Sequence, residues 1–168
     1  MEGEIINRVA NSKLVTFNLE DFYPEGPRTL LDISPWLLEG IVLQEKAFRQ
    51  TLKEHDWSQY EGHYVAVHCT TDAIVPAWAY MLIATYLQPY ATKTVIGTLE
   101  TLETTLYASL IEHMDVSDFK DKPVIIKGCA HKPVPENAYL WIAQKIQTVA
   151  KSVMYGEACS SVPLFKKK

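Results

Sequence analysis

The residues of this chain best suited to metal or thiol chemistry are Cys69, Cys129, His131 and Cys159. Zinc prefers cysteine thiolate and imidazole as ligands, and iron also accepts them. Cys129 and His131 are two positions apart, so a single loop could present both side chains. The spacing matches no standard zinc finger. We therefore treat these four residues as candidate metal ligands, with zinc the first choice and iron or an iron–sulfur cluster the second.

Two of the cysteines occur in similar surroundings. Residues 68–84 read HCTTDAIVPAWAYMLIA, and residues 128–143 read GCAHKPVPENAYLWIA. Aligned from Val-Pro, VPAWAYMLIA and VPENAYLWIA agree at six of ten positions. In both segments a β-rich run precedes the cysteine and a proline-led apolar run follows it. The pattern predicts a small internal repeat of one strand and one helix.

The repeat puts both cysteines at the carboxyl end of a predicted strand and just before a helix. Ligands of open parallel sheets bind outside these strand ends, where the strand order reverses. A strand order of 2-1-3 would make the strands of Cys69 and Cys129 neighbours, about 4.8 Å apart. We then expect one shared pocket in which two helix N-termini favour thiolate over thiol.

Two alternatives to the metal site stay open. In a thiol or redox enzyme, Cys129 would be the nucleophile, His131 a base and Cys69 a resolving thiol. In a scaffold without chemistry, the cysteines would fill core space and the chain would form a homodimer through aromatic residues of its helices. Those aromatic residues are Trp78, Tyr80, Tyr139 and Trp141. The sequence assigns no catalytic residue and no substrate.

Cys159 stands in the segment KSVMYGEACSSVPLFKKK near the end of the sequence. We expect Gly156 to end the proline-led helix that follows Cys129. The residues after Gly156 should pack back on the body, since an exposed thiol is a liability. A helix of 16 to 20 residues is about 25–30 Å long, which would put Cys159 at the opposite edge from Cys129. The chain would have to cross back, or a second chain would have to supply Cys159.

Alternating strand and helix patterns predict the fold class. Strands are expected over residues 29–33, 63–69, 93–98 and 123–129, and helices over 39–55, 75–87, 99–114 and 134–154. This β-α-β-α-β-α order predicts an α/β fold with three layers, α/β/α, and a mostly parallel sheet, preceded by a strand and a helix. Pro76 and Pro135 should each begin a helix within its first turn.

The chain length of 168 residues favours a single domain. We divide it into an N-terminal extension over residues 1–60, a core over 61–154 and a C-terminal tail over 155–168. Residues 4–12 are expected to form a short amphipathic helix.

Composition argues against several classes of protein. The net charge of −4, with Lys166–Lys168 as the only basic cluster, argues against nucleic-acid binding. The longest uncharged stretch, residues 73–92, holds too short an apolar part to cross a membrane. No signal peptide precedes the three cysteines, so we expect reduced thiols and a cytoplasmic location. Glycine motifs that bind nucleotide phosphates do not occur.

Three segments resemble an uncharacterised bacterial family, domain-of-unknown-function family 2480. They are LEGIVLQEKAFRQTLKEHDWSQYEG, VIIKGC and KSVMYGEACSSVPLFKK, and the MYGE-x-CS-x-VP pattern of the last is the most specific. The resemblance covers nearly the whole chain. It implies a small cytoplasmic bacterial protein, and it implies no reaction, cofactor or site residue.

Overall fold

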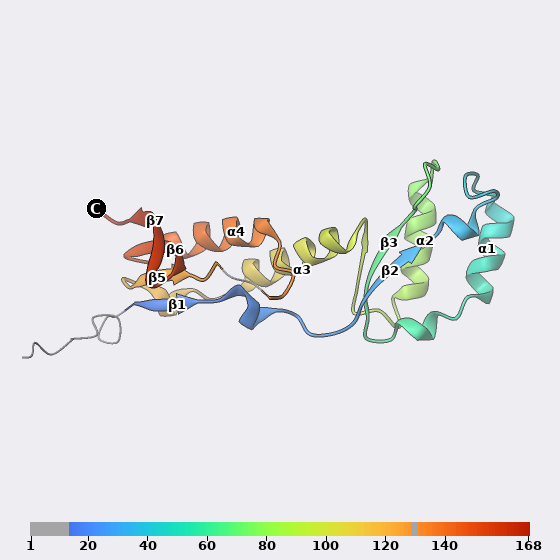
Figure 1. Cartoon of the computed structure of the whole chain (residues 1–168). Coiled ribbons are helices and arrows are strands. Elements are labelled where there is room, and N and C mark those ends of the chain that lie inside the picture. The colour runs from blue at the N-terminus through green and yellow to red at the C-terminus, as the bar shows by residue number, and fades with distance from the viewer. Residues whose placement is uncertain (1–13, 129–130) are drawn as a thin grey trace, which may run out of the picture. The chain divides into compact units, whose positions relative to one another are not determined.

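The computed structural model describes residues 14–128 and 131–168, and it confirms the α/β class (Figure 1). These residues form two compact units. Unit 1 consists of the described residues up to Tyr23 together with Leu106–Lys168, and unit 2 is Pro24–Thr105. The boundary falls within one helix, so its first residues are described with unit 2 and its last with unit 1. Each unit has its own sheet and its own apolar core.

Unit 2 is a parallel three-stranded sheet in the order β2-β3-β4. Its strands and helices are β2 (Arg28–Asp32), α1 (Glu45–Glu54), β3 (Tyr64–His68), α2 (Ala77–Leu87) and β4 (Lys93–Ile96). Short 3-10 helices lie at Ser34–Trp36 and Trp57–Tyr60. Phe48 of α1 and Ile83 of α2 pack with Val65 and Val67 of β3 in the core.

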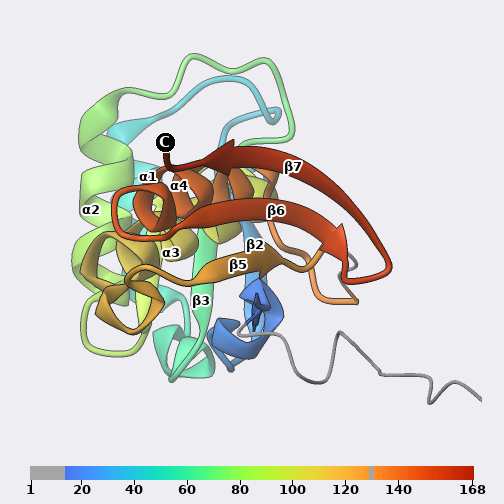
Figure 2. The ribbon, with the colours of Figure 1, turned by 90° about the vertical axis from the view of Figure 1, so that its left-hand side faces the viewer.

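Unit 1 is a four-stranded sheet in the order β1-β5-β6-β7 (Figure 2). Its elements are β1 (Val15–Phe17), α3 (Leu99–His113), β5 (Pro123–Ile126), α4 (Glu136–Gln147), β6 (Ser152–Glu157) and β7 (Ser160–Lys166), with 3-10 helices at Leu19–Phe22 and Ser117–Phe119. β1, β5 and β6 are parallel, whereas β7 is antiparallel to β6. Tyr107 and Ile142 pack with Val124 and Ile126.

The two units repeat one pattern with an offset of 59 residues. The buried residues of α2 are Ala79, Ile83 and Leu87, and those of α4 are Ala138, Ile142 and Ile146. Their spacing of four residues puts one apolar stripe on each helix. Phe48 and Leu52 of α1 likewise correspond to Tyr107 and Ile111 of α3, and Val65–Val67 correspond to Val124–Ile126. The predicted internal repeat is therefore larger than one strand and one helix.

Backbone details follow the same offset. Pro76 and Pro135 are the N-cap residues of α2 and α4, each with φ −69° and ψ 147°, which confirms that the prolines begin helices. Gly62 (φ 74°) corresponds to Asp121 (φ 56°), so both units need a left-handed residue before the central strand. The hydrogen bond from Thr92 N to His63 O (2.8 Å) recurs as Lys151 N to Lys122 O (2.9 Å).

Two predictions of the arrangement are wrong. The strands before Cys69 and Cys129 are not neighbours: β3 lies between β2 and β4, whereas β5 lies between β1 and β6. The helix expected over residues 134–154 also ends earlier than predicted. α4 ends at Gln147, and residues 152–157 form β6, in which Val153 packs into the core. Gly156 therefore does not end a helix; it lies near the end of β6 with φ 116°.

A largely buried ion pair fixes the first turns of α3 to the sheet of unit 2. Arg28 Nε of β2 donates to Glu103 Oε1 at 2.7 Å, and a second guanidinium nitrogen donates to Oε2 at 3.3 Å. The two side chains are only 11% and 7% exposed. The Arg28 guanidinium also donates to Gly26 O and stacks on the ring of Tyr64. Such a bidentate pair orients both side chains and leaves neither charge unpaired.

Glu103→Ala should lower the free energy of unfolding by about 3–5 kcal/mol, because it leaves a buried arginine without its carboxylate. Glu100→Ala is the matched control, since Glu100 is exposed one turn earlier on the same helix. Chemical denaturation at neutral pH measures both. A loss below about 1 kcal/mol in Glu103→Ala would show that the pair is not needed.

Candidate functional site

The carboxyl edge of the sheet in unit 2 is held together by one carboxylate. Asp32, the last residue of β2, accepts hydrogen bonds from the backbone N–H and the hydroxyl of Ser34, at 3.0 and 2.7 Å. It also accepts from the backbone N–H and the hydroxyl of Thr70, at 3.1 and 2.7 Å. Since Thr70 lies in the loop after β3, Asp32 joins the loops of two neighbouring strands.

These bonds change the acidity of Asp32. Desolvation raises the pKa of this carboxyl, but the four hydrogen bonds from Ser34 and Thr70 outweigh it and hold the pKa well below the ordinary 3.8. The carboxylate is therefore ionised over the physiological range, and its lone pairs are engaged by the two loops. Its role is to shape this edge.

Cys69 follows β3 in the same loop and is half-buried. Its Sγ atom lies 3.2 Å from the hydroxyl of Thr71, which in turn donates to the carbonyl of Gly40. Tyr80, on the first turn of α2, is also close: burial raises the pKa of its phenol, and the neighbouring Cys69 raises it further. The sulfur thus lies beside hydroxyl groups, and among residues 14–128 and 131–168 it belongs to no group of three potential metal ligands.

An apolar groove of about 590 Å³ adjoins this edge and is missing from the sequence predictions. It is lined by Ile41, Val42, Leu43, Glu45, Asp72, Ile74, Pro76 and Trp78. One wall is a tight hairpin in which Leu38 pairs with Val42, and Glu39 and Gly40 have φ 51° and 72°. Positive φ at both central residues is typical of a type I′ turn. The helix expected over residues 39–55 is therefore wrong at its start, because the hairpin occupies its first residues and α1 begins only at Glu45.

The carboxyl edge of unit 1 is held in the same way by a different carboxylate. Glu20, in the 3-10 helix after β1, accepts hydrogen bonds at Oε1 from the backbone N–H groups of His131 and Lys132, the latter at 2.6 Å. The bond from Lys132 lowers the pKa of Glu20; desolvation opposes it, and the bond from His131 lowers the pKa further. The Lys132 ammonium lies 5.0 Å from the ring centroid of Tyr23.

The structure brings the segment of Cys159 to the edge that carries His131. After α4 the chain returns along β6, which is parallel to β5, and Cys159 follows in the β6–β7 turn (Figure 2). The turn and the β5–α4 loop thus follow adjacent parallel strands. Tyr155 of β6 bridges them by donating to Gly128 O at 3.4 Å. The chain therefore does cross back, along β6, and the tail packs on the body as β7. Cys159 is nevertheless exposed, so this packing does not cover its thiol as expected.

The four predicted ligands are not all described. Cys129 lies outside the described residues, and Cys69 belongs to unit 2 whereas His131 and Cys159 belong to unit 1. His131 and Cys159 are exposed. Within residues 14–128 and 131–168, no three histidine, cysteine, aspartate or glutamate residues form a group that could hold a metal ion. A site at the edge of unit 1 would therefore need Cys129.

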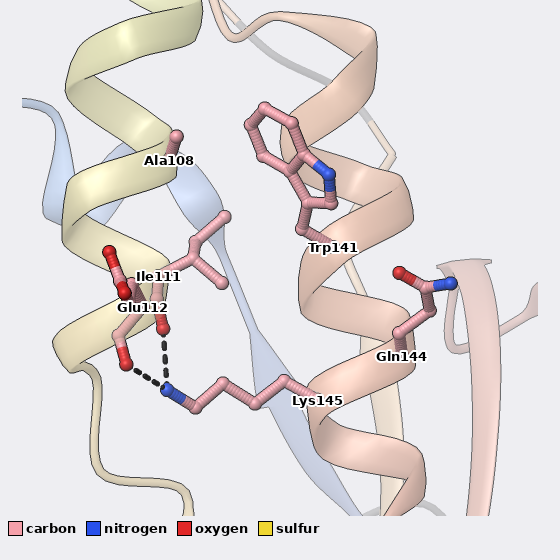
Figure 3. Close-up of a pocket in the computed structure, with 6 residues that line it drawn as sticks. All are labelled: Ala108, Ile111, Glu112, Trp141, Gln144 and Lys145. Carbon is pink, nitrogen blue, oxygen red and sulfur yellow. Dashed lines mark hydrogen bonds between the residues drawn. The ribbon is translucent and has the colours of Figure 1, made fainter.

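A second hollow, of about 470 Å³, lies between α3 and α4 in unit 1 (Figure 3). Trp141 forms its apolar wall opposite Ala108. Lys145 donates to the carbonyls of Ile111 and Glu112, both at 2.6 Å. The ammonium therefore satisfies carbonyl groups at the end of α3 and complements the negative end of its dipole. The positive charge of Lys145 thus stabilises the C-terminal end of α3.

The sequence analysis missed Asp32 and Glu20, although a local signal existed for the first. Asp-x-Ser occurs at Asp32–Ser34, Asp56–Ser58 and Asp115–Ser117, and in each case the carboxylate accepts the backbone N–H two residues on. This is the local turn that short polar side chains favour. The partner across the sheet, Thr70 or His131, cannot be read from such a motif.

The model of the family described as Protein of unknown function (DUF2480) matches residues 3–167. The chain belongs to the DUF2480 family. This confirms the resemblance drawn from the MYGE-x-CS-x-VP segment. No curated protein and no solved structure matched this DUF2480 chain.

Within the described residues 14–128 and 131–168, no helix of the DUF2480 chain has both the length and the apolar character needed to cross a bilayer.

Asp32→Asn should lower the free energy of unfolding at pH 7 by about 1–2 kcal/mol, because an amide cannot accept from all four donors. The folded-state pKa of Asp32 is depressed, so its stabilising effect is present above its ordinary pKa of 3.8 and is lost as the pH falls below it. The difference from wild type should therefore shrink between pH 7 and about pH 2. Chemical denaturation at both pH values measures it.

Asp72→Asn is the control for Asp32→Asn, because Asp72 is an exposed carboxylate in the β3–α2 loop to which Asp32 is bonded. It should leave the free energy of unfolding within about 0.5 kcal/mol of wild type. An Asp32→Asn deficit that stayed constant down to low pH would contradict the role given to this carboxylate.

Glu20→Ala should loosen the loop that carries His131, since it removes the acceptor of two backbone N–H groups. We expect the amide protons of His131 and Lys132 to exchange with deuterium several-fold faster than in wild type. Asp21→Ala is the control, because Asp21 accepts only a bond from Asn18 in its own turn among the bonds described (3.3 Å). Equal exchange in wild type and Glu20→Ala would rule out this role for Glu20.

Proposed function

We propose that this DUF2480 protein binds zinc at the carboxyl edge of the sheet in unit 1, through Cys129, His131 and Cys159. One observation carries the proposal: the loop of Cys129 and His131 and the turn of Cys159 follow two adjacent parallel strands, β5 and β6. Adjacent parallel strands are about 4.8 Å apart, so segments that follow them can share one ion.

The donor set suits the ion. Two thiolates and one imidazole are ligands that zinc favours, and iron is the second choice for the same set. Three protein ligands would leave a fourth position for water or substrate, and zinc bound in this way acts as a Lewis acid and acidifies its water. The thiols must be reduced to bind, which agrees with the cytoplasmic location that we propose.

The chain would contribute the positions of the ligands. Glu20 fixes the backbone at His131 and Lys132, and the hydrogen bond from Tyr155 to Gly128 joins β6 to the start of the same loop. Polar groups beside metal ligands commonly set ligand orientation in this way. Reduced mobility of the loop would lower the entropy cost of binding the ion.

Cys69 is left out of the proposed ligand set. The reason for including it was that its strand would neighbour that of Cys129, and β3 and β5 belong to different sheets. Its sulfur instead contacts the hydroxyl of Thr71 at 3.2 Å. Cys69 therefore provides a matched control for the other cysteines.

The test measures zinc in the full chain, purified without a histidine tag and without chelator. Wild type and Cys69→Ser should each retain about one equivalent of zinc, whereas His131→Ala and Cys159→Ser should lose it or bind it at least about tenfold more weakly. A chelator should lower the melting temperature of wild type and of Cys69→Ser, because an ion that binds only the folded state stabilises it.

Three outcomes would contradict the proposal. Metal-free wild type that gains no melting temperature on addition of zinc would exclude the site. Zinc retained in both His131→Ala and Cys159→Ser would exclude this ligand set, and zinc lost from Cys69→Ser would show that the set is incomplete. If the wild type takes up no zinc, rapid alkylation of Cys129 near neutral pH would favour the thiol nucleophile instead.

A further inference from the structure

The internal repeat shows that one sheet edge of unit 2 lacks the strand that covers its counterpart. β6 of unit 1 and β4 of unit 2 occupy equivalent places after the crossover helix. β6 is covered along its outer side by the antiparallel strand β7, from Ser152 opposite Lys166 to Glu157 opposite Ser160. Among the described residues of unit 2, no strand pairs with the outer side of β4, because the chain passes after Gly97 directly into α3.

The backbone groups that point outward from β4 can be identified. Gly97 N donates to Val67 O of β3 at 2.9 Å, and Val65 lies opposite Thr94, so Lys93, Val95 and Gly97 are directed inward. Backbone groups alternate along a strand, and those of Thr94 and Ile96 are therefore directed outward. α3 begins at Leu99, and the Arg28–Glu103 ion pair ties its first turns to β2, at the other edge of the sheet.

We propose that β4 pairs with β4 of a second copy of this chain, antiparallel and across a two-fold axis at Val95. The direction comes from the repeat, in which the equivalent edge carries an antiparallel strand. An edge that pairs with itself is a common solution for homodimers, since one surface patch serves both subunits. The result is a continuous sheet of six strands, and the exposed edge of β4, a hazard for aggregation, is removed.

The residues of β4 are compatible with this register. Val95 lies opposite Val95 of the partner subunit, Thr94 opposite Ile96 of the partner subunit, and Lys93 opposite Gly97 of the partner subunit. No two lysines therefore face each other, and like charges directly opposite would destabilise the pair. Ile96, which is 60% exposed, gains a cross-strand neighbour. The strand proposed to cover β4 is thus β4 of a second copy of this chain.

The first experiment is sedimentation equilibrium of the full chain and two lysine variants. Wild type should be a dimer, and Val95→Lys should dissociate at a concentration at least about tenfold higher, because two ammonium groups then face each other across the axis. Leu30→Lys is the matched control: Leu30 and Val95 flank Ala66 on the same sheet face, but Leu30 lies on the β2 edge. It should keep the dimer. Circular dichroism and thermal melting check that both variants fold.

The second experiment does not depend on a destabilising substitution. Since the backbone groups of Val95 face β3, the two Val95 residues would form a non-hydrogen-bonded antiparallel pair, with Cα atoms about 4.5 Å apart, within the range of a disulfide. Val95→Cys should therefore give a covalent dimer on mild oxidation, with the link between the two residues at position 95 identified by peptide mass spectrometry. Leu30→Cys should give no such link.

Either of two results would overturn the proposal. One is a monomeric wild type at concentrations up to about 1 mM, which is weaker association than a specific homodimer needs. The other is a dimer that Val95→Lys leaves intact and that Val95→Cys does not link, which would assign the interface to another surface, such as the aromatic helices.

Discussion

Parallel pairing is the constraint on which the rest of this structure depends. Two parallel strands cannot be joined by a tight turn, so each pair requires a crossover that returns the chain to the same end of the sheet. α2 and α4 are these crossovers, and their apolar stripes fix them on β3 and β5. Every β-to-α loop in a unit consequently leaves the same edge. Asp32 at the end of β2 and Glu20 after β1 can therefore reach the loops after β3 and β5.

Sequence patterns predicted the elements well because the signals are local. Proline at a helix start placed the beginnings of α2 and α4 within two residues of those observed. The assignment of strands to sheets was not predictable in this way. β1 pairs with β5, which lies more than 100 residues later in the chain. A βαβ sequence pattern also does not show whether the second strand joins the same sheet as the first or begins another sheet. The end of α4 was misplaced because Lys151–Met154 lacks a strong break, although Val153 packs as part of a strand.

The candidate site was predictable by residue type and by strand end, but not by grouping. The repeat keeps the packing residues and changes those of the edge: Cys69, Asp72 and Ile74 of unit 2 stand where unit 1 has Gly128, His131 and Pro133. One edge has become an apolar groove beside a hydroxyl cluster, and the other presents histidine and cysteine. Residues in the core are constrained by the volume that they must fill, whereas residues in loops are exposed and can diverge in sequence. Sequence similarity between the two cysteine loops therefore overstated the likeness of the two edges.

The division of unit 1 along the chain has a consequence for how the protein is made. All of unit 2, Pro24–Thr105, leaves the ribosome before β5, to which β1 must pair. Domains generally fold as units during synthesis, so unit 2 can complete its sheet before β5, the partner strand of β1, has been synthesised. Contacts between distant segments form slowly, and an unpaired strand such as β1 is exposed to other chains in the meantime. The short length of β1, three residues, keeps that exposed edge small.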